Sequence, residues 1–248
     1  MEFNLSILIA ISLLMFFSAF LYSSVGHGGG SGYLAVMALF GFLPELMKPT
    51  ALSLNILVAS IATIKYYKAN YFSWQLFWPF AVTSIPFAFI GGLIKLSDDI
   101  YRPIVGFVLL FAAYRLFKKS IEMQSPNHIN PTTSVALLLG AGIGLLSGIT
   151  GVGGGIFLSP LLLFLGWAEI RHISGIAAAF ILVNSISGLA GHWVGVKSLP
   201  ETILIFGISV VIGGIIGSEL GSRQLGTPIL RRLLAVVLII AGAKFIFV

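Results

Sequence analysis

The sequence Val25-Gly26-His27-Gly28-Gly29-Gly30 lies near the N-terminus and recurs, 125 positions later, as Thr150-Gly151-Val152-Gly153-Gly154-Gly155. Self-similarity at a fixed offset is typical of an internal repeat, in which one folding unit occurs twice. We therefore predict two tandem copies of one unit, spanning residues 1–120 and 131–248. A polar linker over residues 121–130, which contains two asparagines and a proline, joins them.

The match continues beyond the glycines, in the same order along both copies. Gly41 and Glu45 in the first copy correspond to Gly166 and Glu169 in the second, with one residue deleted. Near the end of each copy, a pair of basic residues 13 positions apart flanks an apolar stretch. These pairs are Arg102 with Arg115, and Arg231 with Lys244. The duplication therefore covers nearly the whole chain.

The composition excludes an ordinary soluble domain, because 58% of the 248 residues are hydrophobic and only 9% are charged. Lys, Arg, Asp and Glu are also absent from four long stretches. Each stretch can hold a helix of roughly 20 apolar residues, the length that crosses the hydrocarbon layer of a membrane. We therefore expect an all-α integral membrane protein. The stretches lie between Glu2 and Glu45, Lys68 and Lys95, Glu122 and Glu169, and Arg171 and Lys197.

Each copy is predicted to contain five apolar helical segments, with a glycine-rich break before the second. The second segment is too short for a straight crossing, because 12 or 13 helical residues rise only ~18 to 20 Å against a core of ~30 Å. Two interpretations are open: a tilted helix in a thinned membrane, or one arm of a re-entrant hairpin. The segments span about residues 4–22, 31–42, 48–67, 74–96 and 101–118, then 132–147, 154–166, 172–192, 200–222 and 228–247.

Either interpretation gives an odd number of crossings in each copy, so we expect the second copy to be inverted relative to the first. The positive-inside rule favours the same arrangement. With both termini outside, nine of the 14 Lys and Arg residues fall inside, whereas parallel copies divide them seven and seven.

The two glycine stretches are the predicted binding site, because interrupted helices in inverted repeats place a ligand near the middle of the membrane. Glycine lets a solute approach main-chain N–H groups closely and allows left-handed backbone conformations. A helix begins directly after each stretch, so its free N–H groups and positive dipole end point into the same space. Such a site favours a small anion. The alternative role of the glycines is close packing between helices, which is common in membranes.

Polar residues near the glycines are further candidates for binding an anion. Hydroxyl groups can complete the hydrogen-bond shell of an oxyanion, or can instead bond a carbonyl one turn earlier. An imidazole inside an apolar stretch is costly, which marks His27 as a candidate for carrying charge or a proton. Asn55 and Asn184 lie mid-helix, where an amide must face protein or water. The candidate binding residues are Ser24, Gly26, His27, Gly28, Gly29, Gly30, Ser31, Asn55, Thr150, Gly151, Gly153, Gly154, Gly155 and Asn184, with Ser23, Ser147 and Ser159 as further hydroxyls nearby.

Other functions find less support in the sequence. Paired carboxylates, metal-spaced histidines and a catalytic triad are absent from the apolar stretches, so we predict neither an enzyme nor a cofactor or metal. The absence of cysteine excludes thiol chemistry. Basic residues are scattered rather than arranged in a stripe, which argues against nucleic acid as a partner. His192 and Glu219 lie toward helix ends, where we expect both to snorkel to the interface. A passive anion channel and a membrane-embedded enzyme are the alternatives.

A duplicated Gly-x-Gly-Gly-Gly motif, followed by a short helix and a Gly/Ala/Ser/Asn-rich helix, resembles the TauE/SafE sulfite exporter family. The stretch Gly151-Val152-Gly153-Gly154-Gly155-Ile156-Phe157-Leu158-Ser159-Pro160 is close to that family's pattern. The first copy departs from it, because Ser31-Gly32-Tyr33 follows the glycines and no proline corresponds to Pro160. The resemblance implies a transporter of sulfur-containing anions, such as sulfite or sulfonates, in the cytoplasmic membrane. Its implied partners are the anion and lipid, while coupling to protons and the oligomeric state are left open.

Overall fold

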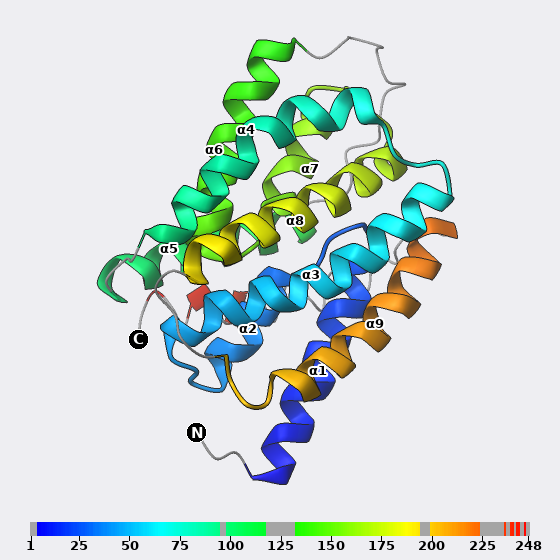
Figure 1. Cartoon of the computed structure of the whole chain (residues 1–248). Coiled ribbons are helices and arrows are strands. Elements are labelled where there is room, and N and C mark those ends of the chain that lie inside the picture. Colours follow the sequence, from blue (N-terminus) through cyan, green and yellow to red (C-terminus); the bar gives the residue numbers. More distant parts are fainter. Residues whose placement is uncertain are drawn as a thin grey trace.

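The computed structural model describes residues 4–94, 98–117, 132–193 and 199–223, together with single helical positions between 236 and 246. The described ranges form nine α-helices and no strand (Figure 1). The predicted all-helical fold class is therefore confirmed. The helices are α1 (Leu5–Ser23), α2 (Gly30–Leu39), α3 (Pro44–Lys68), α4 (Trp74–Leu93), α5 (Asp98–Phe117), α6 (Thr133–Thr150), α7 (Gly155–Phe164), α8 (Ile170–Trp193) and α9 (Ile203–Arg223).

Six of the described helices, α1, α3, α4, α6, α8 and α9, are long and apolar enough to cross a membrane. They carry large apolar side chains on their outward faces, such as Leu204, which is 76% exposed, and Leu138, which is 75% exposed. A soluble monomer rarely exposes apolar side chains over such a wide area, whereas lipid tails accommodate them. The structure therefore supports a multi-pass membrane protein.

The helix lengths repeat along the chain. They are 19, 10, 25 and 20 residues for α1 to α4, and 18, 10, 24 and 21 residues for α6 to α9. The largest shift from the predicted bounds is at α3, which begins at Pro44, because proline fits the first helical turn without losing a hydrogen bond. The predicted linker 121–130 and most of the last segment, 228–247, lie outside the described residues.

α1 and α9 pack against each other in parallel. Gly213 of α9 lies on the backbone of Phe16 in α1, and Gly221, two turns later, lies on the backbone of Ser24. Gly217 occupies the turn between them, and a Cβ added there would overlap the α1 backbone. These small residues let the two helices approach without intervening side chains.

α3 runs beside α9 in the same direction. Leu57 lies near Gly207, and further along both helices Lys65 forms an ion pair with Glu219. Arg223 approaches the same carboxylate, with 2.7 Å between Nη2 and Oε1. α1, α3 and α9 therefore form one parallel group of helices.

α4, α6 and α8 form a second parallel group. Gly140 and Gly148 of α6 lie on the backbone of Phe80 and Ala88 in α4, with Gly144 on the turn between them. α8 follows the same direction along α4. The contacts between α8 and α4 join Ser187 to Ile85 and Gly191 to Phe89.

The two groups meet where α3 and α8 lie side by side in opposite directions (Figure 1). His192, near the end of α8, is close to Lys48, near the start of α3. At the opposite end, Gly175 near the start of α8 lies against Tyr66 and Tyr71 at the end of α3. One apolar core includes side chains of α1, α2, α3, α5 and α9 together with Ile156 of α7, and another includes side chains of α4, α6 and α8 together with Leu158 and Leu162 of α7. A small third cluster of Ala62, Tyr66 and Ala178 joins α3 to α8.

Candidate functional site

Two loops interrupt the helices at the predicted glycines. The first glycine loop, residues 24–29, connects α1 to α2, and the second glycine loop, residues 151–154, connects α6 to α7. Gly29 has φ of 113° and Gly154 has φ of 79°, values that L-amino acids with side chains rarely adopt. Glycine is therefore required where the chain turns directly into each short helix.

The first glycine loop runs along α3 from its end to its middle. At the start of the loop, the Ser24 carbonyl accepts a hydrogen bond of 3.0 Å from Tyr66 Oη. Directly after the loop, Gly30 lies beside Asn55. Asn55 precedes Tyr66 by 11 residues, or ~16 Å along α3. α2 continues toward the start of α3. The segment from Ser24 to Pro44 thus follows the length of α3, first as a loop and then as a short helix.

The second glycine loop follows α3 in the opposite sense. Gly151 lies on the backbone of Lys48, close to the start of α3, and Gly153 reaches Asn55. α7 then leads toward the first residues of α8, where Arg171 Nη1 donates to Tyr71 Oη at 2.6 Å. α2 and α7 therefore begin at a similar level of the bundle and point in opposite directions.

Asn55 lies between the two glycine loops and contacts both. Its Nδ2 donates a 3.1 Å hydrogen bond to the Val152 carbonyl of the second loop. On the other side, a Cβ added at Gly28 would lie only 2.7 Å from Asn55 Oδ1. The side chain is fully buried, and Oδ1 has no hydrogen-bond partner within the described residues. One amide therefore links the loops and still offers a free acceptor.

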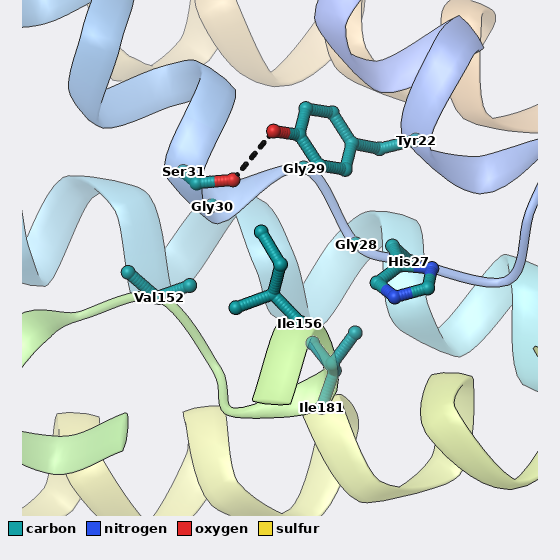
Figure 2. Close-up of a pocket in the computed structure, with 9 residues that line it drawn as sticks. All are labelled: Tyr22, His27, Gly28, Gly29, Gly30, Ser31, Val152, Ile156 and Ile181. Carbon is teal, nitrogen blue, oxygen red and sulfur yellow. Dashed lines mark hydrogen bonds between the residues drawn. The ribbon is translucent and has the colours of Figure 1, made fainter. Parts of the chain in front are cut away.

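Ile181 of α8 occupies the matching position on the other side of the loops. A Cβ added at Gly28 would lie 3.0 Å from its Cγ2, and one added at Gly153 would lie 2.9 Å from the same atom. Figure 2 shows Ile181 and Ile156 pointing toward the first glycine loop. The centre is therefore polar at Asn55 of α3 and apolar at Ile181 of α8.

Hydroxyl groups line the side of the site formed by the first glycine loop. Ser31 Oγ donates to Tyr22 Oη at 2.6 Å, a bond drawn in Figure 2. Tyr33 Oη donates to the Gly28 carbonyl at 2.7 Å. The first bond joins α2 to α1, and the second holds the loop against α2. Both stabilise the bent backbone around Gly28.

His27 connects the first glycine loop to α7. Its Nδ1 lies 2.8 Å from the Val25 carbonyl, and its Nε2 lies 3.1 Å from Ser159 Oγ. A carbonyl only accepts, so Nδ1 carries a proton and donates to Val25. His27 thus bridges the two halves of the chain from within the predicted site.

A small cavity lies where the loops meet (Figure 2). Its volume is about 10 Å³, enough for about one water molecule but not for a sulfite ion. An ion as large as sulfite can therefore bind here only if the surrounding helices separate. The cavity is lined by Tyr22, His27, Gly28, Gly29, Gly30, Ser31, Val152, Ile156 and Ile181.

Several buried polar groups around the loops lack partners within the described part of the chain. Besides Asn55 Oδ1, these are Ser185 Oγ and Ser147 Oγ, which lie beside the second glycine loop. In the same part of the chain, no other backbone group accepts from the N–H groups of Gly28, Gly29, Gly153 and Gly154. Buried polar groups without partners are costly, and a bound polar ligand is one way to satisfy them.

Three predicted binding residues use their side chains locally instead. Ser24 Oγ donates to the Leu21 carbonyl, and Thr150 Oγ1 donates to the Leu146 carbonyl, both at 2.7 Å. The Asn184 Nδ2 donates to the Phe180 carbonyl of its own helix at 2.8 Å. These bonds correspond to the alternative of bonding a carbonyl one turn earlier.

The structure contradicts the expected snorkelling of His192. This residue is only 9% exposed, and its Nε2 is buried without a partner in the described ranges. It faces inward because Gly92 and Gly148 leave room where α4, α6 and α8 converge. Glu219 is partly exposed, as expected, and pairs with Lys65 and Arg223.

Four further neighbours of the loops were not predicted from the sequence: Tyr22, Tyr33, Ile181 and Ser185. The second copy has Ser147 and Leu158 where the first has Tyr22 and Tyr33, so the repeat pattern provides no signal for the tyrosines. Ile181 and Ser185 resemble any residues of an apolar helix. Only the crossing of α3 and α8 brings them to the site.

The fold and the site define a class of protein. It is an all-helical, multi-pass membrane protein in which two short helices follow glycine loops and begin beside one buried amide, that of Asn55. The family model for sulfite exporter TauE/SafE matches residues 11–245. The chain therefore belongs to the TauE/SafE sulfite exporter family, which is a family of membrane transporters, and the resemblance based on the glycine motifs is confirmed.

Curated relatives agree with this assignment. The chain is 36% identical to the probable membrane transporter protein y4hK of Sinorhizobium fredii, over 96% of this chain and 98% of that protein. It is 23% identical to the probable membrane transporter protein YjnA of Bacillus subtilis, over 96% and 99% of the two chains. No solved structure matches the chain significantly.

Proposed function

We propose that this chain is a secondary transporter for a small sulfur-containing anion, such as sulfite or a sulfonate, which binds where the two glycine loops meet. The observation that carries the proposal is the convergence of both loops on Asn55. Loop N–H groups without backbone partners supply donors from two sides, and α2 and α7 each direct a positive helix end toward this region. No buried carboxylate is found there among the described residues to oppose an anion.

The two copies form inverted repeats in this proposal. Helices α1, α3 and α4 of the first copy run opposite to their counterparts α6, α8 and α9, as the contacts between the groups require. Each short helix begins about halfway along α3, which corresponds to the middle of the membrane. The second segment of each copy then crosses the membrane as half loop and half helix, which favours crossing over the re-entrant alternative.

Transport requires the closed centre to open alternately toward each side. The helices divide into two groups that surround different apolar cores, and the groups meet along α3 and α8. We propose that these groups rock against each other along the contact between α3 and α8. The cavity of about 10 Å³ then corresponds to a centre that is closed toward both sides.

The distribution of basic residues supports an orientation. The end of the bundle near Tyr66 carries Lys65, Lys68, Arg171 and Arg223, whereas the opposite end has fewer basic residues among those described. The positive-inside rule places the basic end in the cytoplasm and the start of α1 outside.

Cysteine labelling tests this inverted arrangement. The natural chain has no cysteine, and both Glu45 and Glu169 are exposed at opposite ends of the α3–α8 pair. A membrane-impermeant maleimide is expected to label Glu45→Cys from outside intact cells and Glu169→Cys only after permeabilisation. Labelling of both variants from the same side would contradict the inversion.

Reconstituted protein provides the test of the substrate. In proteoliposomes, sulfite flux is expected to saturate, to be reduced by competing small sulfonates, and to run uphill when a proton gradient is imposed. Flux that follows only the sulfite gradient would favour the channel alternative. If neither sulfite nor a sulfonate crosses the membrane or stabilises the purified protein against heating, the proposed substrate class is wrong.

A further inference from the structure

Near its first residues, each glycine loop packs against a residue of α3 or α8, and the two contacts lie at opposite ends of the bundle. At one end, Gly26 of the first loop lies directly on the backbone of Ser174 in α8. At the other end, Gly151 of the second loop lies on Lys48 in α3, and a Cβ added there would be 3.1 Å from the Lys48 Cα. Ser174 and Lys48 therefore occupy corresponding places in the two halves of the molecule.

Their neighbours correspond as well. Ser174 forms a hydrogen bond with Tyr66, whose hydroxyl donates to the Ser24 carbonyl at the end of α1. Lys48 lies close to His192, whose imidazole bonds to the backbone of Gly148 near the end of α6. Each pair thus combines one residue from α3 with one from α8. One member of each pair also bonds to the backbone near the end of the helix that precedes a glycine loop.

The two pairs differ in charge. Tyr66 and Ser174 are neutral, whereas Lys48 carries a positive charge beside an imidazole. Lys48 is 6% exposed and His192 is 9% exposed, and His192 Nε2 has no partner in the described ranges. A buried cation within an apolar bundle is expensive and is retained where it binds or passes an ion.

The location of Lys48 relates it to the central site. Seven residues separate it from Asn55 along α3, a distance of ~10 Å, and the second glycine loop connects the two positions through Gly151 and Gly153. An anion that leaves the centre along this loop therefore passes Lys48 before it reaches the end of the bundle.

We propose that Lys48 and His192 form a second binding site for an oxyanion, which acts as the gate at one end of the pathway. The ammonium attracts the charged head of a sulfite or sulfonate, and the imidazole of His192 lies close to it, held by its bond to the backbone of Gly148. Tyr66 and Ser174 form the opposite gate, in which the paired side chains are both neutral and are joined by a hydrogen bond. The inference rests on the proposed anion pathway and makes its two ends chemically different.

Charge-selective labelling tests this site without requiring sulfite transport. In the otherwise cysteine-free chain, His192→Cys is treated with the anionic 2-sulfonatoethyl methanethiosulfonate and with the cationic 2-(trimethylammonio)ethyl analogue. Each rate is divided by the rate of the same reagent with a free small thiol. We expect the anionic reagent to be preferred about fivefold, and the preference to vanish when Lys48→Met is added.

Three controls separate this effect from misfolding. Lys48→Arg keeps the charge and should keep the preference, and Lys65→Met removes a lysine from the other end of α3 and should leave it unchanged. Ser174→Cys, at the opposite gate, should show no dependence on Lys48. Size-exclusion profiles confirm that each variant is folded.

The proposal is overturned if the anionic preference at His192→Cys survives Lys48→Met, or if neither reagent reaches His192→Cys. A preference that depends on Lys48 in a protein without sulfite flux would contradict the proposed substrate and leave the cationic gate supported. Normal sulfite flux without any charge preference would overturn the gate alone.

Discussion

The Asn55→Leu variant is expected to lose sulfite flux by roughly 10- to 100-fold while it still folds. The second N–H of Asn55 Nδ2 is the group that can donate to an anion, because the free Oδ1 only accepts. A hydrogen bond to a charged ligand contributes ~1.5 to 3 kcal/mol, and leucine has nearly the size of asparagine but offers no polar atom. The substitution also breaks the bond from Nδ2 to the Val152 carbonyl, which joins α3 to the second glycine loop. Thermal stabilisation by sulfite measures the loss of the bond to the anion. Flux in proteoliposomes measures the effect of the substitution on transport.

Asn184→Leu is the matched control for this substitution. Asn184 is equally buried and equally central in its helix, but its Nδ2 bonds to the Phe180 carbonyl of the same helix. We expect Asn184→Leu to keep sulfite flux within about twofold, since losing a local neutral hydrogen bond costs only ~1 kcal/mol. Equal losses in both variants would show that Asn55 has no special place in binding.

Gly217→Leu and Gly144→Leu are expected to prevent folding of the membrane-inserted chain. A Cβ at Gly217 would overlap the backbone of Phe20, and one at Gly144 would overlap the backbone of Ser84. Backbone atoms cannot move aside as a flexible side chain does, so the helix pair must separate and lose its contacts. Overpacking of this kind costs ~1 to 3 kcal/mol or more, and we expect little monodisperse protein after detergent extraction.

Gly142→Leu provides the comparison within the same helix. Gly142 is exposed, and a Cβ there would have no described atom within 4 Å. Leucine also favours the helix over glycine by up to ~1 kcal/mol. This variant should therefore be extracted in normal yield with an unchanged size-exclusion profile. A similar loss for Gly142→Leu and Gly144→Leu would contradict the packing explanation.

The sequence was sufficient for the helical class and for the location of the breaks. Long stretches without charge have one stable form in lipid, in which each segment satisfies its own backbone hydrogen bonds. The glycine stretches could be recognised because each interrupts an apolar stretch and because the second repeats the first 125 positions later. The bounds of α4 and α6 consequently lie within a few residues of the predicted segments.

The partners of the polar residues were not predictable in the same way. Asn55 and Asn184 look alike in the sequence, yet one bridges the two loops and the other bonds to its own helix. Ile181, rather than Asn184, contacts both glycine loops opposite Asn55. Which face of α8 points inward depends on how it crosses α3, and one residue of shift rotates a helical side chain by about 100°.

Hydropathy by itself determined that this chain is a helical membrane protein, and the recurring glycine motif predicted two copies with a break in each, because local backbone chemistry suffices for these inferences. Only the tertiary structure decided that both breaks meet at Asn55, that His192 is buried near Lys48, and that the tyrosines line one side. These are contacts between segments 97 or more residues apart, or between neighbouring helices whose rotation the sequence leaves open. Helix packing, which the glycines of α6 and α9 make close, determines them.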